Sequence, residues 1–264
     1  MPADLEALRT NLLELERVLV AFSGGADSAF LAWVANDTLG SDAVQCFTAV
    51  SPSLAQSELE DCASLAEEWG LNWSHVETAE MDNAAYRIND ENRCFHCKSA
   101  LMDVVEPIAC QKELTVVLGV NIDDLGDHRP GQSAAQERLA RFPLVDAGFS
   151  KEDVREHSKK LGLRTWDKPA AACLASRIPY GTQVSVSLLR RLDRAESALK
   201  NLGFDQLRVR DYGEIARLEI DLDQLSRAVD LRAEIVEAVQ SVGYQYVTLD
   251  LEGFRSGNLN HSIQ

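Results

Sequence analysis

The chain has 264 residues, of which 45% are hydrophobic, with 26 Lys and Arg against 42 Asp and Glu and a formal net charge of −16. This composition excludes a disordered chain, a collagen-like repeat and a small disulfide-stapled module. The acidic charge argues against a nucleic-acid partner, because such binding relies on Lys and Arg at phosphates, and favours a small anionic substrate. No apolar run approaches the ~18 residues of a membrane span, and the first residues lack the pattern of a signal peptide. We therefore expect a cytoplasmic protein without membrane contact.

Segments typical of strands and helices alternate along the first two-thirds of the chain. Short continuous apolar runs predict buried strands, and apolar residues at helical spacing or capping motifs predict helices. Strands are expected at 18–22, 44–50, 73–77 and 115–120, and helices at 5–13, 28–39, 53–68 and 150–161. This alternation predicts an α/β fold in which a doubly wound parallel sheet carries helices on both faces.

The pattern changes near the Pro-Tyr-Gly sequence at 179–181. Beyond it we expect helices at 185–202 and 223–242 and strands at 207–210, 215–220 and 244–249. This order predicts a small α+β domain at 181–264, following a larger domain at 1–180.

A glycine-containing loop follows the first predicted strand and opens a helix. Gly24 and Gly25 allow a tight turn and close approach of a ligand, and the N–H groups at the start of a helix bind anions. Ser23 and Ser28 add hydroxyl donors to this anion site. Asp27 suits such a site when a divalent cation lies between its carboxylate and the phosphates. The loop is not a Walker A motif, because Gly-Lys-Ser/Thr is absent.

A second polar segment, 119–131, follows the strand expected at 115–120. It therefore lies at the carboxyl end of a strand, where open α/β sheets bind ligands. Asp124 suits a metal or a ribose, and Arg129 suits a phosphate or carboxylate. The alternative is a solvated acidic loop.

A third segment, 168–181, places Cys173 after three alanines and before Ser176 and Arg177. Small neighbours leave room for a ligand, and a nearby cation favours the thiolate. Cys173 is therefore a candidate nucleophile. The alternative is a buried cysteine in a tight helix.

Cys94 and Cys97 form a C-x-x-C motif, which suits a redox pair, half a zinc site or part of an iron–sulfur site. A second C-x-x-C is missing, which argues against a complete Cys₄ zinc site, but Cys173 supplies a third thiolate for a [4Fe–4S] cluster. The alternative is two unliganded cysteines at the start of a helix. The remaining cysteines, Cys46, Cys62 and Cys110, are expected to be small buried hydrophobic residues.

The Ser-Gly-Gly-x-Asp-Ser sequence at 23–28 resembles the PP-loop of N-type ATP pyrophosphatases. The resemblance implies an adenine nucleotide alpha hydrolase-like fold. It also implies attack of a substrate oxygen on the α-phosphate of ATP, with release of pyrophosphate. Gly24 and Gly25 then hold the pyrophosphate portion, and Asp27 helps to hold Mg²⁺.

The loop, 121–131, 166–169 and 173–181 together resemble the LarE family, the ATP-dependent sulfur transferases that make the nickel-pincer cofactor. The resemblance covers nearly the whole chain. It implies adenylation of a carboxylate of pyridinium-3,5-biscarboxylic acid mononucleotide. Cys173 then displaces AMP, and cleavage of its Cβ–S bond leaves a thiocarboxylate on the substrate and dehydroalanine on the protein.

The same resemblance implies further roles. Ser176 and Arg177 are the nearest candidates to assist the elimination. Glu196, Arg208 and Glu219 match positions used for substrate or metal contacts, although solvated charge is an equal alternative.

Two sulfur sources stay open in this family. One is a sacrificial Cys173, and the other is a [4Fe–4S] cluster on Cys94, Cys97 and Cys173. We slightly favour the cluster, because a sacrificial donor needs no C-x-x-C motif. The resemblance also implies a homo-oligomer and suggests a hexamer.

The alternatives are another PP-loop enzyme, either a tRNA thiolase or an amide-forming synthetase, and a non-catalytic nucleotide-binding regulator. The acidic charge argues against tRNA. No glutaminase-like segment is evident to supply ammonia.

Overall fold

The computed structural model describes residues 3–126, 135, 137–169 and 172–255. Contacts along the chain divide it into two compact units, each described by itself. Unit 1 comprises Met1–Ser51, Glu58–Tyr86 and Asn92–Ala171, and unit 2 comprises Pro52–Ser57, Arg87–Glu91 and Ala172–Gln264. Residues 172–180 thus group with unit 2 by their contacts, and the domain limits of 1–180 and 181–264 stay a prediction.

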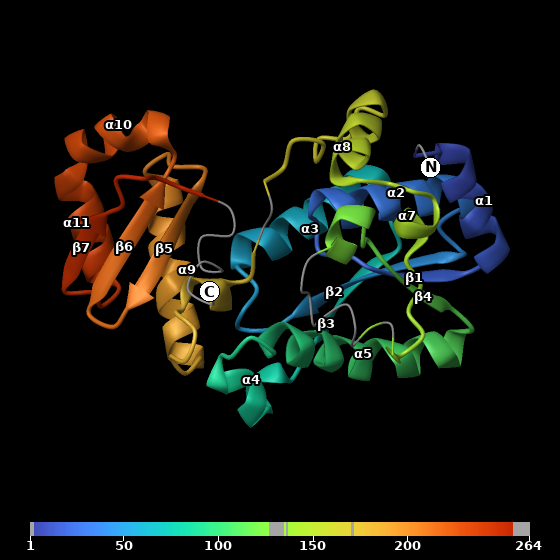
Figure 1. Ribbon diagram of the computed structural model, residues 1–264, viewed down its shortest axis with the longest axis horizontal. Coiled ribbons are helices and arrows are strands. Elements are labelled where there is room, and N and C mark those ends of the chain that lie inside the picture. The colour runs from blue at the N-terminus through green and yellow to red at the C-terminus, as the bar shows by residue number, and fades with distance from the viewer. Residues whose placement is uncertain (1–2, 127–134, 136, 170–171, 256–264) are drawn as a thin grey trace. The chain divides into compact units, whose positions relative to one another are not determined.

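Unit 1 is built on a parallel sheet of four strands (Figure 1). The strands are β1 Val18–Ala21, β2 Val44–Val50, β3 Trp73–Glu77 and β4 Thr115–Leu118, in the order β3-β2-β1-β4. Successive strands run outward from β1 to β3, and β4 then returns to the other side of β1. The strand order therefore reverses beside β1, and the carboxyl ends of β1 and β4 are where such sheets bind ligands.

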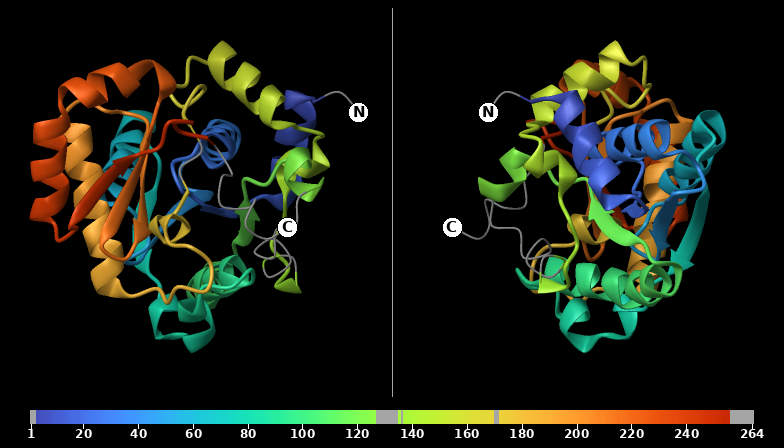
Figure 2. Two further views of the ribbon diagram at one scale, coloured as in Figure 1. Left: turned by 60° about the vertical axis from the view of Figure 1, so that its left-hand side comes forward. Right: turned by 90° about the vertical axis from the view of Figure 1, so that its right-hand side faces the viewer.

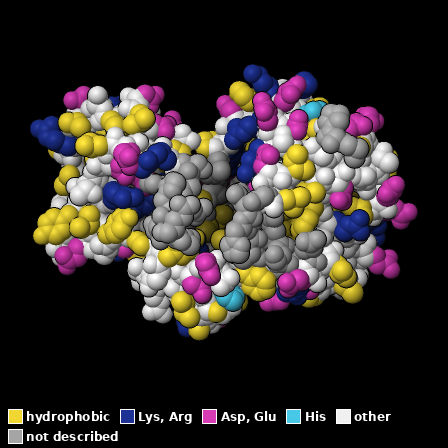
Figure 3. Space-filling model, viewed as in Figure 1, with side chains coloured by type: hydrophobic (Ala, Val, Ile, Leu, Met, Phe, Trp, Pro, Cys, Tyr) yellow, Lys and Arg dark blue, Asp and Glu magenta, His cyan; other side chains and the backbone are white. Residues whose placement is uncertain are grey.

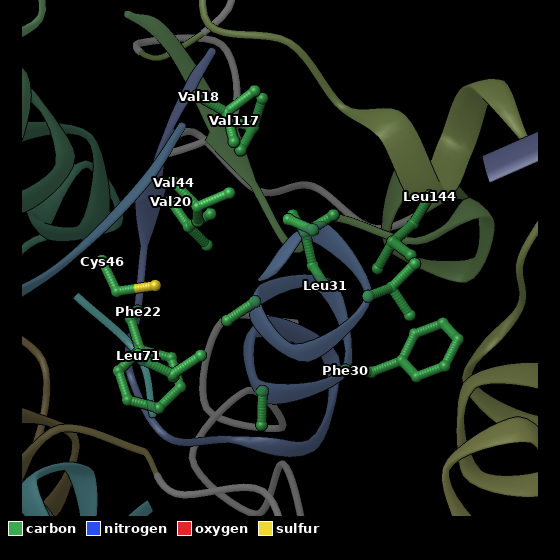
Figure 4. Close-up of a cluster of buried hydrophobic side chains, with 14 of the residues drawn as sticks. Val18, Val20, Phe22, Phe30, Leu31, Val44, Cys46, Leu71, Val117 and Leu144 are labelled. Atoms are coloured by element: carbon green, nitrogen blue, oxygen red, sulfur yellow. The ribbon is translucent and has the colours of Figure 1, made fainter. Parts of the chain in front are cut away.

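Helices cover both faces of this sheet, which confirms the predicted fold class. Among the described residues before 161, the α-helices are α1 Leu5–Leu15, α2 Ala26–Leu39, α3 Gln56–Trp69, α4 Ala84–Ile88, α5 Arg93–Lys112, α7 Pro143–Asp146 and α8 Lys151–Lys160. Val18 and Val20 pack in one core with residues of α1, α2, α3 and α8 (Figure 4), whereas Leu19 packs in a second core with residues of α5. Successive side chains of a strand point to opposite faces, so β1 is buried on both sides.

Unit 2 is a small α+β structure, as expected (Figure 2). Its sheet has the order β5-β6-β7, from β5 Leu207–Tyr212, β6 Ile215–Ile220 and β7 Tyr246–Leu249. β5 and β6 are antiparallel, and β6 and β7 are parallel. Helices α9 Val186–Asn201 and α11 Arg232–Ser241 pack against each other and against this sheet.

Two helical expectations differ from the structure. The helix expected at 223–242 is divided at Leu231 into α10 Leu225–Asp230 and α11, because the backbone of Leu231 leaves the helical region (ψ 20°). Of the 20-residue helix α5, the sequence predicts only the start, in the alternative that places Cys94 and Cys97 at the beginning of a helix. It contains Pro107, a residue that usually ends or kinks a helix.

Acidic and basic side chains are interspersed on the face shown in Figure 3. None of the helices that the structure describes is long and apolar enough to cross a membrane.

Candidate functional site

The loop between β1 and α2 has the tight geometry that its glycines predict. Gly24 has a φ of +69°, and a Cβ there would lie 2.8 Å from Sγ of Cys62. Burial raises the pKa of that cysteine to about 11, so it stays a neutral thiol beneath the loop. The N–H of Ser23 donates to Oγ of Ser28 (3.2 Å), which in turn donates to the carbonyl of Gly25 (3.1 Å). The loop is therefore closed on the first turn of α2, which leaves the helix N-terminus as an anion site.

At Gly119 the end of β4 lies directly against this loop. No pattern in the sequence predicted this contact. A Cβ on Gly119 would lie 2.7 Å from the backbone N of Ser28. Only glycine therefore fits here, and the loop lies where the strand order reverses.

Two carboxylates lie at this edge of the sheet. Burial and the charge of Asp124 raise the pKa of Asp27, against the opposing effects of a hydrogen bond with Asn121 and of the cations Lys151 and Arg155. Asp124 is buried, its N–H donates to Oδ1 of Asn121 (3.2 Å), and its carboxylate pairs with Nζ of Lys151 (3.0 Å). Like charges at close range repel, and a divalent cation relieves that repulsion.

The oxygen donors of Asp27 and Asp124 thus fit the preference of Mg²⁺ for carboxylates. Within the described ranges, no three His, Cys, Asp or Glu side chains form a ready metal site. Arg129, the other expected ligand-binding residue of this segment, lies outside the described residues.

Lys168, which lies near the end of unit 1 in the sequence, contacts the loop between β1 and α2. Its ammonium donates to the carbonyl of Gly24 (3.1 Å) and to the carboxylates of Glu58 (2.9 Å) and Asp61 (2.6 Å). Burial alone lowers the pKa of Lys168, but the hydrogen bonds with Asp61 and Glu58 outweigh it, and the net shift is upward. The amine is therefore a fixed positive charge beneath the loop.

Arg155 of α8 holds the segment that carries Lys168. Its guanidinium donates to the carbonyl oxygens of Trp166 (3.1 Å) and Lys168 (2.9 Å). An irregular segment lacks the regular backbone hydrogen bonds of a helix or strand, and these two bonds satisfy its carbonyl oxygens instead. Arg155 therefore positions Lys168.

In unit 2, Cys173 is exposed and precedes a short 3₁₀ helix, Leu174–Arg177. The alternative of a cysteine buried in a tight helix is therefore wrong. Arg177 is 4% exposed, and its guanidinium makes two bonds of 2.9 Å to the carboxylate of Glu196. It also donates to the carbonyl of Cys173 (3.0 Å) and to Oγ of Ser176 (3.1 Å). The buried ion pair thus fixes the turn that presents the thiol.

The two carboxylates expected to hold a metal in unit 2 are bound by arginines. Glu196 pairs with Arg177, and Glu219 accepts bonds from Arg210 (3.0 and 2.8 Å) and Arg217 (3.0 Å). A cation at either glutamate would have to displace a guanidinium, so the metal role of both stays a prediction.

Arg208 lies in the same group of charges. Burial and the positive charge of Arg177 lower the pKa of Arg208 to about 10. The charges of Glu196 and Glu219 oppose this shift, and the substrate contact expected of Arg208 stays a prediction.

The remaining cysteines give a mixed result. Cys46 and Cys62 are buried as expected, but the expectation for Cys110 is wrong, because it is exposed near the end of α5. Cys94 is exposed and Cys97 is partly exposed at the start of α5, where a spacing of three residues places them on one side of the helix. They belong to unit 1 and Cys173 to unit 2, so their joint cluster stays a prediction.

Comparison with known proteins identifies the family. Residues 7–103, which include the loop, match the family described as NAD synthase. Pyridinium-3,5-bisthiocarboxylic acid mononucleotide synthase of Lactiplantibacillus plantarum is 36% identical over 253 residues, covering 96% of this chain and 92% of that protein. The chain belongs to the LarE family. The family resemblance drawn from the sequence is thereby confirmed.

The LarE-family chain is also similar to other proteins. An uncharacterized protein of Synechocystis sp. is 48% identical over 266 residues, covering 100% of this chain and 99% of that protein. One subunit of the glutamine-hydrolyzing GMP synthase of Thermoplasma acidophilum is 27% identical over 212 residues, covering 70% of this chain and 66% of that protein. As a LarE-family chain with an NAD synthase-like segment, the protein is an enzyme.

Proposed function

We propose that this protein is an ATP-dependent sulfur transferase that converts a carboxylate of pyridinium-3,5-biscarboxylic acid mononucleotide into a thiocarboxylate. The observation that carries the proposal is its 36% identity, over 96% of the chain, to the synthase of the bisthiocarboxylic product. The anion site between β1 and α2 and the exposed thiol of Cys173 supply the two functional groups that such a reaction needs.

The first step is activation of the acid. A carboxylate oxygen of the substrate attacks the α-phosphorus of ATP, pyrophosphate leaves with the electron pair, and an acyl adenylate forms. The N–H groups of the loop and of the first turn of α2 bind the phosphates. Asp27 and Asp124 would hold Mg²⁺, which supplies positive charge against the phosphates.

The second step transfers sulfur. The thiolate of Cys173 attacks the acyl carbon, AMP leaves, and a thioester joins the substrate to the protein. Loss of the Cα proton of Cys173 and cleavage of its Cβ–S bond then release the thiocarboxylate and leave dehydroalanine. In the alternative, Cys94, Cys97 and Cys173 hold a [4Fe–4S] cluster that delivers the sulfur, and the side chain of Cys173 survives.

Pyrophosphate release tests the first step. We expect release from ATP to depend on the pyridinium mononucleotide, and not on tRNA or on ammonia. Dependence on tRNA would point to a thiolase. Dependence on ammonia would point to an amide-forming synthetase. No release with any acceptor would favour a nucleotide-binding regulator.

Intact-protein mass after one turnover tests the second step. A sacrificial Cys173 predicts loss of one H₂S per chain. A cluster predicts an unchanged polypeptide mass and a brown, oxygen-sensitive protein. Sulfur transfer by a Cys173→Ala variant would contradict both versions.

A further inference from the structure

The carbonyl oxygen of Cys173 accepts two hydrogen bonds from its own turn. One comes from the backbone N–H of Ser176 (2.9 Å) and the other from the guanidinium of Arg177 (3.0 Å). The same guanidinium nitrogen also donates to the carbonyl of the preceding residue, Ala172 (2.5 Å). Two converging donors on one carbonyl oxygen are the arrangement that stabilises a developing oxyanion. Here the carbonyl belongs to the residue whose Cα–H bond must break if its sulfur is to leave.

We propose that Ser176 N–H and Arg177 form an oxyanion site for the enolate of Cys173, and that this site drives the β-elimination that frees its sulfur. The inference rests on the proposed function in its sacrificial form. It assigns Arg177 to the protein's own carbonyl group, in place of a contact with the sulfur-bearing product.

The step balances without any further reagent. A solvent base removes the proton from Cα of Cys173, and the electron pair is delocalised onto the carbonyl oxygen as an enolate. The pair then forms the Cα–Cβ double bond while the Cβ–S bond breaks. Sulfur leaves with that bond's electrons, as the thiocarboxylate of the substrate.

The surroundings of Arg177 suit this role. The bidentate bond of Arg177 to Glu196 fixes the plane of its guanidinium. Arg177 is 4% exposed, and a hydrogen bond to a developing charge is stronger away from water. Cys173 itself is exposed, which suits removal of its Cα proton by a solvent base.

The same chain contains a matched internal control. Cys110 is exposed, and its carbonyl accepts a backbone N–H from Glu113 (3.4 Å). No guanidinium donates to that carbonyl in any bond that the structure records among the described residues. The carbonyl of Cys110 thus has one backbone donor, whereas the carbonyl of Cys173 has a backbone donor and Arg177.

The test uses the full-length protein without ATP or substrate. Treatment with 2,5-dibromohexanediamide converts exposed cysteines into cyclic sulfonium adducts, which eliminate to dehydroalanine at mildly alkaline pH. Peptide mass mapping against time gives the elimination rate at each position. We expect Cys173 to eliminate roughly 100-fold faster than Cys110, the effect of an added oxyanion donor.

Variants separate this effect from general damage to the fold. Arg177→Met would leave Glu196 buried and unpaired, so the double variant Arg177→Met/Glu196→Gln removes the ion pair without a stranded charge. We expect it to bring the rate at Cys173 down to that at Cys110. Arg227→Met is the matched control, because Arg227 also donates to carbonyl oxygens, those of Leu202 (2.6 Å) and Gly203 (2.7 Å), away from the cysteine.

Equal rates at Cys173 and Cys110 in the unmodified chain, or a fast Cys173 in the double variant, would overturn the inference. Slow elimination at Cys173 in Arg227→Met would overturn it as well, because the rate would then follow the fold of unit 2. This assay needs no ATP. Failure of pyrophosphate release therefore refutes the proposed function separately, and failure here leaves adenylation untouched.

Discussion

Lys168 and Gly24 are 144 residues apart in the chain, yet the ammonium of one donates to the carbonyl of the other at 3.1 Å. The same ammonium neutralises Glu58 and Asp61, two carboxylates that would otherwise oppose a bound triphosphate. The anion site at the loop therefore depends on a lysine from a distant segment.

Lys168→Met should weaken ATP use. Loss of the amine frees the loop and leaves the negative charges of Glu58 and Asp61 less compensated near the bound phosphates, so we expect the KM for ATP to rise by about tenfold, equivalent to roughly 1.4 kcal/mol. Pyrophosphate release at varied ATP measures it. Arg164→Met is the matched control, because Arg164 also pairs with Asp61 (2.7 Å) and its recorded bonds do not reach the loop. Equal effects of the two substitutions would contradict a role specific to the loop.

Asp27→Asn should separate stability from function. The pKa of Asp27 is raised, so the folded state binds a proton more tightly than the unfolded state. In metal-free protein its ionisation therefore lowers the free energy of unfolding as pH rises from the ordinary value of 3.8 through the raised pKa. We expect Asp27→Asn to raise the melting temperature of metal-free protein at pH 7, by about 2 to 4 °C per 1 kcal/mol gained. The same variant should lose Mg²⁺-dependent pyrophosphate release. A lower melting temperature of Asp27→Asn would contradict the inference that burial and the charge of Asp124 disfavour the ionised form of Asp27.

Gly119→Ala should disturb the loop by steric conflict. The new Cβ would lie 2.7 Å from backbone N of Ser28, and backbone atoms cannot move aside cheaply. We expect a loss of about 1–3 kcal/mol in the free energy of unfolding, measured by urea denaturation. Gly25→Ala is the comparison for stability, because its Cβ meets only Oγ of Ser23, at 3.6 Å. Similar losses in both variants would show that general crowding of the loop, and not the approach of β4, is responsible.

The C-x-x-C cysteines distinguish the two sulfur sources. If Cys173 is sacrificial, Cys94→Ser/Cys97→Ser keeps one sulfur transfer per chain, because neither thiol takes part. If a cluster delivers the sulfur, this variant loses both the visible absorbance and the transfer. Thiocarboxylate formed per chain in a single turnover measures the outcome. Cys110→Ser, which changes another exposed cysteine of α5, is the matched control.

Local signals were sufficient for the loop and its strand and helix. An apolar run predicts β1, glycine accommodates the φ of +69° at Gly24, and the helix begins directly after Gly25. Each of these depends on neighbours along the chain, which the sequence displays. The same kind of signal was misleading for Cys110, whose exposure depends on which side of α5 faces the core.

The amino-acid order alone was enough to predict the class of fold, the tight glycine loop between β1 and α2, and the family, because these follow from short-range patterns and a long run of matching segments. Folding was needed to show that Lys168 holds Gly24, that Gly119 lies against Ser28, and that Arg177, anchored by Glu196, donates to the carbonyl of Cys173. These contacts form because folding brings side chains and backbone segments together that are distant in the sequence. The spacing of residues along the chain does not predict them.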